Sequence, residues 1–127
     1  MSVFFNARSI INKWDIFLAT VCDLNPDLIA ITESWSTNNI LDAELQLSGY
    51  QMFRRDRNTD NRGGGVLLYT RDSVNATEVQ LESGFGEHVW CQIGELLVGV
   101  IYRSNNTRIV GQDSNKNLLE LLKKSLW

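Results

Sequence analysis

The chain has 127 residues, of which 43% are hydrophobic and 21% are charged. This composition is typical of one globular domain and excludes a disordered or low-complexity chain. The net charge of −3 excludes a global attraction to nucleic acid or to an anionic membrane, so any nucleic-acid contact must come from a local basic patch.

The sequence also predicts where the protein resides. The longest apolar run, Leu96–Ile101, is far shorter than the roughly 18 residues of a membrane span. The N-terminus lacks the basic and apolar regions of a secretory signal. Cys22 and Cys91 have no metal-type spacing and are expected to be reduced and buried. We therefore expect an intracellular protein, nuclear or cytoplasmic, with no membrane contact.

The first part of the chain predicts a strand, a helix and a second strand. Met1–Phe5 is a short apolar piece typical of a strand, and Ser9 is a suitable N-cap for a helix over Ile10–Asp23. Pro26 then opens the run Leu28–Ile31, whose length and β-branched residues indicate a buried strand. Such a unit of about thirty residues favours a parallel βαβ arrangement.

The rest of the chain predicts an α/β fold with one mixed β-sheet and flanking helices. A charged, glycine-rich loop is expected over Arg55–Gly65, and a polar loop over Arg103–Asn115. The other expected elements are a short helix over Leu41–Leu47, strands over Tyr50–Arg54 and Val66–Thr70, an edge strand over Val74–Leu81, a hairpin of Val89–Ile93 and Glu95–Tyr102, and a final helix marked by Leu118, Leu119, Leu122 and Leu126.

Two polar residues follow the first two expected strands. Asn6 follows the first and Glu33 the second, so parallel strands would bring both to one edge of the sheet. Amide and carboxylate oxygens suit a hard cation such as Mg²⁺. Viewed alone, Asn6 is equally well explained as a capping or turn residue, and position alone favours Glu33 as the first solvated residue of a loop.

Arginines form the one concentrated basic segment of the chain. Arg54, Arg55 and Arg57 precede a run of three glycines, Gly63–Gly65. Arginine forks fit phosphate oxygens, and glycines allow a backbone to approach a polyanion closely. A solvated loop explains the segment equally well. No Lys-Ser/Thr pair follows the glycines, which excludes the phosphate loop of nucleotide hydrolases.

Two further positions carry groups that could reach the same edge. Tyr102 and Arg103 end a strong strand, which would place a phenol and a guanidinium there. A tyrosine at a strand end is also common in plain packing. His88, the one histidine, comes before a strand rather than after it, so we expect a structural or surface role.

Together these stretches resemble the endonuclease/exonuclease/phosphatase superfamily, most of all the apurinic-type endonuclease domain of non-LTR retrotransposon polyproteins. The resemblance covers essentially the whole chain. The matching stretches, in family order, are FFNARSIINK (Phe4–Lys13), PDLIAITESW (Pro26–Trp35), GYQMFRRDRNTDNRGGGVLLY (Gly49–Tyr69), EHVWCQI (Glu87–Ile93), VIYRS (Val100–Ser104) and NLLELL (Asn117–Leu122).

The resemblance implies a role for individual residues and for DNA as the partner. Asn6 matches the family asparagine beside the metal and the scissile phosphate, and Glu33 matches the glutamate that ligates Mg²⁺. Tyr102 matches the tyrosine that contacts the phosphate. The arginine segment matches the part that packs near the DNA-facing side. Ser104 departs from the proline that relatives usually have, which leaves the shape of that loop open.

Two family motifs are absent from the 127 residues, namely Gly-Asp-Phe-Asn and Ser-Asp-His. We therefore expect residues 1–127 to form a partial domain, the N-terminal half of a four-layer α/β sandwich, truncated and inactive alone. The alternative is a non-catalytic transposon remnant that acts at most as a weak binding module. An in-frame Gly-Asp-Phe-Asn downstream would assign the activity to a longer protein. In relatives a reverse transcriptase follows, and the sequence leaves the oligomeric state open.

Overall fold

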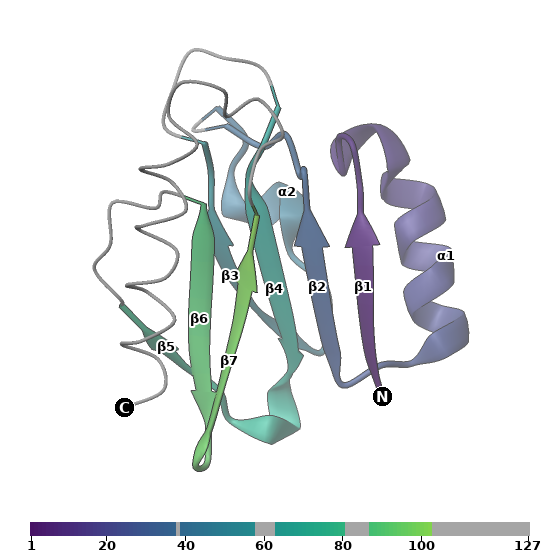
Figure 1. The fold of residues 1–127 in the computed structure, drawn as a ribbon. Coiled ribbons are helices and arrows are strands. Elements are labelled where there is room, and N and C mark those ends of the chain that lie inside the picture. Colours follow the sequence, from purple (N-terminus) through teal and green to yellow (C-terminus); the bar gives the residue numbers. More distant parts are fainter. Residues whose placement is uncertain (38, 58–62, 81–86, 103–127) are drawn as a thin grey trace.

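The computed structural model describes residues 1–37, 39–57, 63–80 and 87–102. Within these residues four strands form a mixed sheet, in the order β1, β2, β4, β3 (Figure 1). β1 and β2 are parallel, as the sequence predicted, and β4 is antiparallel to β2 and β3. The strands are β1 (Ser2–Asn6), β2 (Leu28–Thr32), β3 (Tyr50–Arg55) and β4 (Val66–Arg71).

A second, antiparallel sheet lies in front of the first in Figure 1, and it corrects the expectation of one mixed sheet. It contains β5 (Thr77–Val79), β6 (His88–Ile93) and β7 (Leu96–Ile101). The physical reason lies in β4, whose first five residues are all buried. A strand that is apolar on both faces must be covered on both sides, so the hairpin stacks on the first sheet instead of extending its edge.

Helices cover the other face of the first sheet. The expected first helix consists of a 3-10 turn, η1 (Ile11–Lys13), and then α1 (Trp14–Leu24). Ser9 is not its N-cap: Ile10 precedes η1 and Lys13 precedes α1, and neither helix start has a side-chain cap. The short helix is α2 (Asp42–Leu45), and a second 3-10 turn, η2 (Asp72–Val74), precedes β5. The final helix lies outside the described residues.

Two apolar clusters hold the three layers together. Phe17 of α1 packs against Tyr69 and Ile31 on one face of the first sheet. Between the sheets, Leu68 belongs to the same cluster as Cys91. Burial of apolar area on both faces therefore fixes the layer order helix, sheet, sheet. Cys91 is buried as expected, whereas Cys22 is exposed, and both thiols are free.

The fold brings the ends of several strands to the upper end of the molecule in Figure 1. β1 and β2 are parallel and end there, and the antiparallel hairpin returns β7 to the same end. In the part of the chain that the structure describes, every helix is too short or too polar to cross a lipid bilayer. The upper strand ends therefore carry the polar residues that the sequence singled out.

Candidate active site at the strand ends

Glu33 lies in a tightly held turn directly after β2. The amides of Ser9 and Ile10 donate to the carbonyls of Glu33 and Ser34 at 3.0 Å, so the segment after β1 stays paired with this turn. Glu33 and Trp35 have φ values of 54° and 57°, the left-handed region that residues other than glycine seldom adopt. A backbone conformation of this kind persists only where surrounding contacts enforce it.

The structure brings Tyr102 to the Glu33 carboxylate. Burial is the largest cause that raises the pKa of the Tyr102 phenol, and the charge and hydrogen bonding of Glu33 raise it further. The charge of Glu87 adds to the rise, while Arg57 opposes it. Like any tyrosine, Tyr102 is a neutral hydroxyl donor at neutral pH, and it lies next to a half-buried carboxylate that follows a strand of the other sheet.

Asn6 lies at the same end, on the last residue of β1. It is paired with Thr32, one residue before Glu33, and it is exposed. Successive side chains of a strand alternate between its faces, and Phe5 packs in the helix-side core. Asn6 therefore faces the side of the sheet on which β7 and Tyr102 lie.

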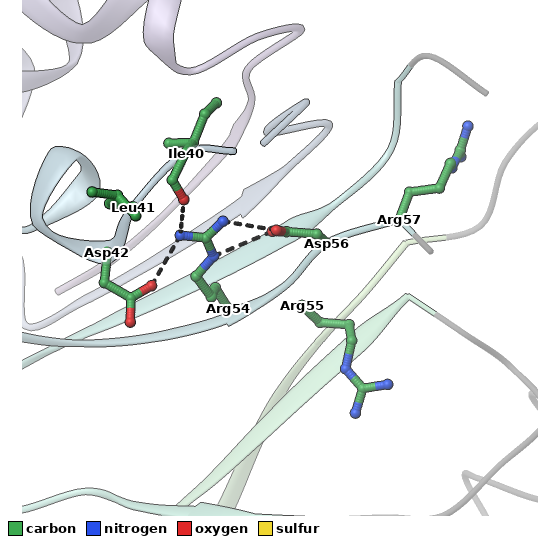
Figure 2. A pocket seen from close by; sticks show the side chains of 7 residues that line it. All are labelled: Ile40, Leu41, Asp42, Arg54, Arg55, Asp56 and Arg57. Carbon is green, nitrogen blue, oxygen red and sulfur yellow. Dashed lines mark hydrogen bonds and ion pairs between the residues drawn. The ribbon is translucent and has the colours of Figure 1, made fainter. Parts of the chain in front are cut away.

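Arg54 has its whole guanidinium engaged by the protein itself. It makes five hydrogen bonds, to the carbonyls of Thr37 and Ile40, to one oxygen of Asp42 and to both oxygens of Asp56. Figure 2 shows Asp42, Asp56 and the Ile40 carbonyl around it. An arginine has no N–H beyond those five. In this arrangement Arg54 organises the protein and has no donor left for a phosphate.

Arg57 forms a two-point ion pair with Glu87, with both nitrogen–oxygen distances at 3.2 Å. Glu87 also accepts the amide of Gly65 at 2.8 Å. A Cβ added at Gly64 would lie 2.0 Å from the Glu87 carboxylate and 2.3 Å from Arg57 Nε. The φ of 69° at Gly64 favours glycine, and any larger residue would also have to displace the ends of the Glu87 and Arg57 side chains.

Arg55 is the arginine of the segment with an exposed side chain. It lines, with Arg54 and Arg57, a surface pocket of about 580 Å³ that also includes Asp42 and Asp56 (Figure 2). In Figure 2 its guanidinium points away from Arg54. Among the described residues, no hydrogen bond or ion pair occupies this guanidinium. Arg103 lies outside the described residues.

His88 is a buried residue of the second sheet. His88 is 3% exposed and its Nδ1 accepts the indole N–H of Trp90, which confirms a structural role.

The sequence reasoning missed Glu87, Asp56, Ser34 and Ser36. The alternation of an extended chain could have paired Arg54 with Asp56, two residues apart. Glu87 gave no comparable signal, because its arginine lies thirty residues earlier.

The donor set at this end fits a magnesium ion only as a partial site. Glu33 supplies one carboxylate and Asn6 one amide oxygen at the same sheet end. Mg²⁺ usually keeps several waters and is bound by one or two carboxylates together with substrate phosphates. Across residues 1–37, 39–57, 63–80 and 87–102, no group of three or more His, Cys, Asp or Glu side chains could hold a metal. Glu33 is thus compatible with Mg²⁺ when phosphate completes the coordination.

Solved structures share this fold, although no protein-family model and no curated protein matches the chain. An AP endonuclease from Leishmania major has a TM-score of 0.75 and 15% identity, over 97% of this chain and 47% of that one. A 3′-5′ exonuclease from Neisseria meningitidis has a TM-score of 0.74 and 14% identity, over 98% and 52%. An AP endonuclease from Archaeoglobus fulgidus has a TM-score of 0.66 and 18% identity, over 98% and 50%.

These likenesses confirm the α/β fold class. The chain spans about half the length of the solved structures that it matches, which fits an N-terminal half of their sandwich. At these identities the likeness concerns the fold alone. The described chain therefore has the fold of one half of the endonuclease/exonuclease/phosphatase proteins, with its polar strand-end residues gathered at one edge.

Proposed function

We propose that the chain is the Glu33-bearing half of a magnesium-dependent DNA endonuclease domain of the kind found in non-LTR retrotransposons. Three observations support this proposal. AP endonucleases and a 3′-5′ exonuclease share the fold, as does a 3′ phosphatase bound to a DNA hairpin. The family motifs occur in order along the sequence, and Glu33, Asn6 and Tyr102 lie at one end of the sheets.

The observation that carries the proposal is the meeting of Glu33 and Tyr102. They follow strands of different sheets, and only the stacking of those sheets brings them together. In the proposed site Glu33 binds Mg²⁺, which supplies Lewis-acid polarisation of a phosphate when bound. The Tyr102 hydroxyl, which is protonated at neutral pH like that of an ordinary tyrosine, donates a hydrogen bond to a phosphate oxygen. Asn6 adds a neutral hydrogen-bonding group beside them.

The arginines of the basic segment have different roles in this proposal. Arg55 contacts the DNA backbone, because its guanidinium is exposed beside the pocket. Arg54 supports the loop, and Arg57 is held by Glu87 at the edge of the site. Arg103 keeps its sequence-based role as a phosphate contact. The electrostatic part of DNA binding therefore depends most on Arg55.

Binding of a labelled DNA duplex, followed by fluorescence anisotropy with and without Mg²⁺, tests the proposal. The chain should bind more tightly with Mg²⁺, and Glu33→Gln should remove that gain. Arg55→Ala should weaken binding for all DNA sequences and lower the slope of log K against log salt by about 1. Binding that ignores Mg²⁺ in both the original chain and Glu33→Gln would contradict the metal role.

Cleavage by the 127-residue chain alone should be negligible. Its one histidine is buried and bound to Trp90, so no histidine is available to activate water. Members of a catalytic set act as a unit, and losing one costs several powers of ten in rate. Incubation of supercoiled plasmid with the chain and Mg²⁺ should leave it intact. Nicking that Glu33→Gln abolishes would show that the described half suffices for catalysis.

A further inference from the structure

We propose that Ser34, Ser36, Asp56 and Arg54 form a positioning network that fixes the Glu33 turn for metal binding. The inference rests on the metal-binding role proposed above for Glu33. None of the four side chains is expected to touch the metal or the DNA. Each acts through the backbone conformation of its neighbours.

A continuous chain of hydrogen bonds connects the four residues. Ser34 Oγ lies 3.1 Å from Ser36 Oγ, which donates to Asp56 Oδ1 at 2.8 Å. Asp56 Oδ2 in turn accepts from Arg54 at 2.7 Å. Ser34 and Ser36 are 1% and 3% exposed, so water does not compete for these hydroxyls.

The network begins at Ser34, which lies between two residues in the left-handed region. Ser34 stands between Glu33 and Trp35, whose φ values are 54° and 57°. The amides of Ser34 and Trp35 donate to the carbonyls of Gly65 and Gly64 at 3.3 and 2.9 Å. A Cβ at Gly65 would lie 2.4 Å from Ser34 Oγ, so the serine hydroxyl fills the space that the glycine leaves. A strained turn held this way from two sides is the arrangement expected at a functional site.

The network ends on the loop that continues from the turn. Arg54 binds the carbonyls of Thr37 and Ile40, so β3 fixes the loop at its middle, while Ser34 and Ser36 fix its start. A metal-binding side chain must be held within about 0.5 Å of the position at which it coordinates the metal. Loss of the network would let the turn relax toward ordinary φ values and move the Glu33 carboxylate. Outer contacts of this kind typically change metal affinity by about 10–100-fold.

Two measurements on Ser36→Ala test the inference. The first is hydrogen exchange of the Ser34 and Trp35 amides by NMR, which reports the turn without any metal. The second is the dissociation constant of Mg²⁺ by calorimetric titration. Tyr50→Phe is the matched control, because it removes one buried hydroxyl bond, to the Pro26 carbonyl, at the opposite end of the sheet. Asp56→Asn is the second variant and preserves the side-chain shape.

In Ser36→Ala and Asp56→Asn, we expect faster exchange of both amides and Mg²⁺ binding weaker by about tenfold. Tyr50→Phe should lower the melting temperature by a similar amount and change neither readout. Unchanged exchange in both network variants, or unchanged Mg²⁺ affinity with faster exchange, would overturn the inference. If the original chain does not bind Mg²⁺, the proposed function fails, while the exchange measurement still decides whether the network holds the turn.

Discussion

The two ends of the four-stranded sheet both carry arginine–aspartate pairs, but they use them differently. At the far end, Arg71 pairs with Asp27, and the two side chains are 29% and 54% exposed. At the end that carries Glu33, Arg54 pairs with Asp56, and the two side chains are only 16% and 14% exposed. Exposed pairs contribute little to stability, whereas breaking a pair withdrawn from water is costly. The same chemistry thus closes the fold at one end and holds a loop in place at the other.

The two ends of the sheet can also be compared through the backbone of two glycines, Gly49 before β3 and Gly65 before β4. Gly49 and Gly65 have φ values of 85° and 86°. A Cβ at Gly49 would meet nothing within 4 Å, while one at Gly65 would overlap Ser34 Oγ. Conformation is therefore matched between the two positions, and only the surroundings differ.

The largest expected effect follows from this pair. Gly65→Ala should lower the free energy of unfolding by about 4 kcal/mol, since strain and overlap add. Gly49→Ala should lower it by about 1 kcal/mol, since only the strain acts. Urea unfolding of both variants measures the difference. Equal losses would show that the turn beside Glu33 is no more constrained than the far end.

Removal of the two arginines should give the next largest difference. Arg54→Met leaves Asp56 partly buried without its partner and should cost about 3 kcal/mol of unfolding free energy. Arg71→Met breaks the exposed contacts to Asp27 and Asn25 and one part-buried bond to the Pro26 carbonyl, and it should cost about 1 kcal/mol. Thermal unfolding of the two variants provides the comparison. A larger loss in Arg71→Met would reverse the assignment of the constrained end.

The smallest expected effect is the loss of stability at acid pH through Asp27, at the far end of the sheet. The terminal ammonium of Met1, by hydrogen bond, and then Arg71 hold the pKa of Asp27 below its ordinary 3.8. A lowered pKa means that the folded chain binds fewer protons, so this stabilisation is present above 3.8 and is lost as the pH falls below it. Asp27→Asn should flatten the melting temperature across that range. A steeper acid dependence in the variant would contradict the sign.

Much of the fold could be predicted from the sequence because its signals are local. The periodicity around Phe17 gives α1, and the β-branched run Leu28–Ile31 gives β2. The stacking of β6 and β7 on the first sheet could not be predicted, because the two apolar faces of β4 require cover on both sides but do not show whether a helix or a second sheet provides it.

The site shows the same division between local and distant signals. Glu33 could be located because it follows a recognisable strand. The partners of the arginines come from distant segments, as Glu87 does for Arg57. The arginine cluster looked uniform in the sequence, yet Arg54 is wholly engaged and Arg55 is exposed. Charge counts do not reveal which donors the fold has already used.

A magnesium titration followed by NMR tests the central claim most directly, that the strand-end edge carrying Glu33 binds the metal. The amide signals of Glu33 and Tyr102 should shift with Mg²⁺ in the original chain, and those of Tyr50 at the far end should not. Glu33→Gln should abolish the shifts while the fold, seen in the remaining signals, is kept. Shifts that persist unchanged in Glu33→Gln, or that gather around Asp27 and Tyr50, would contradict the account.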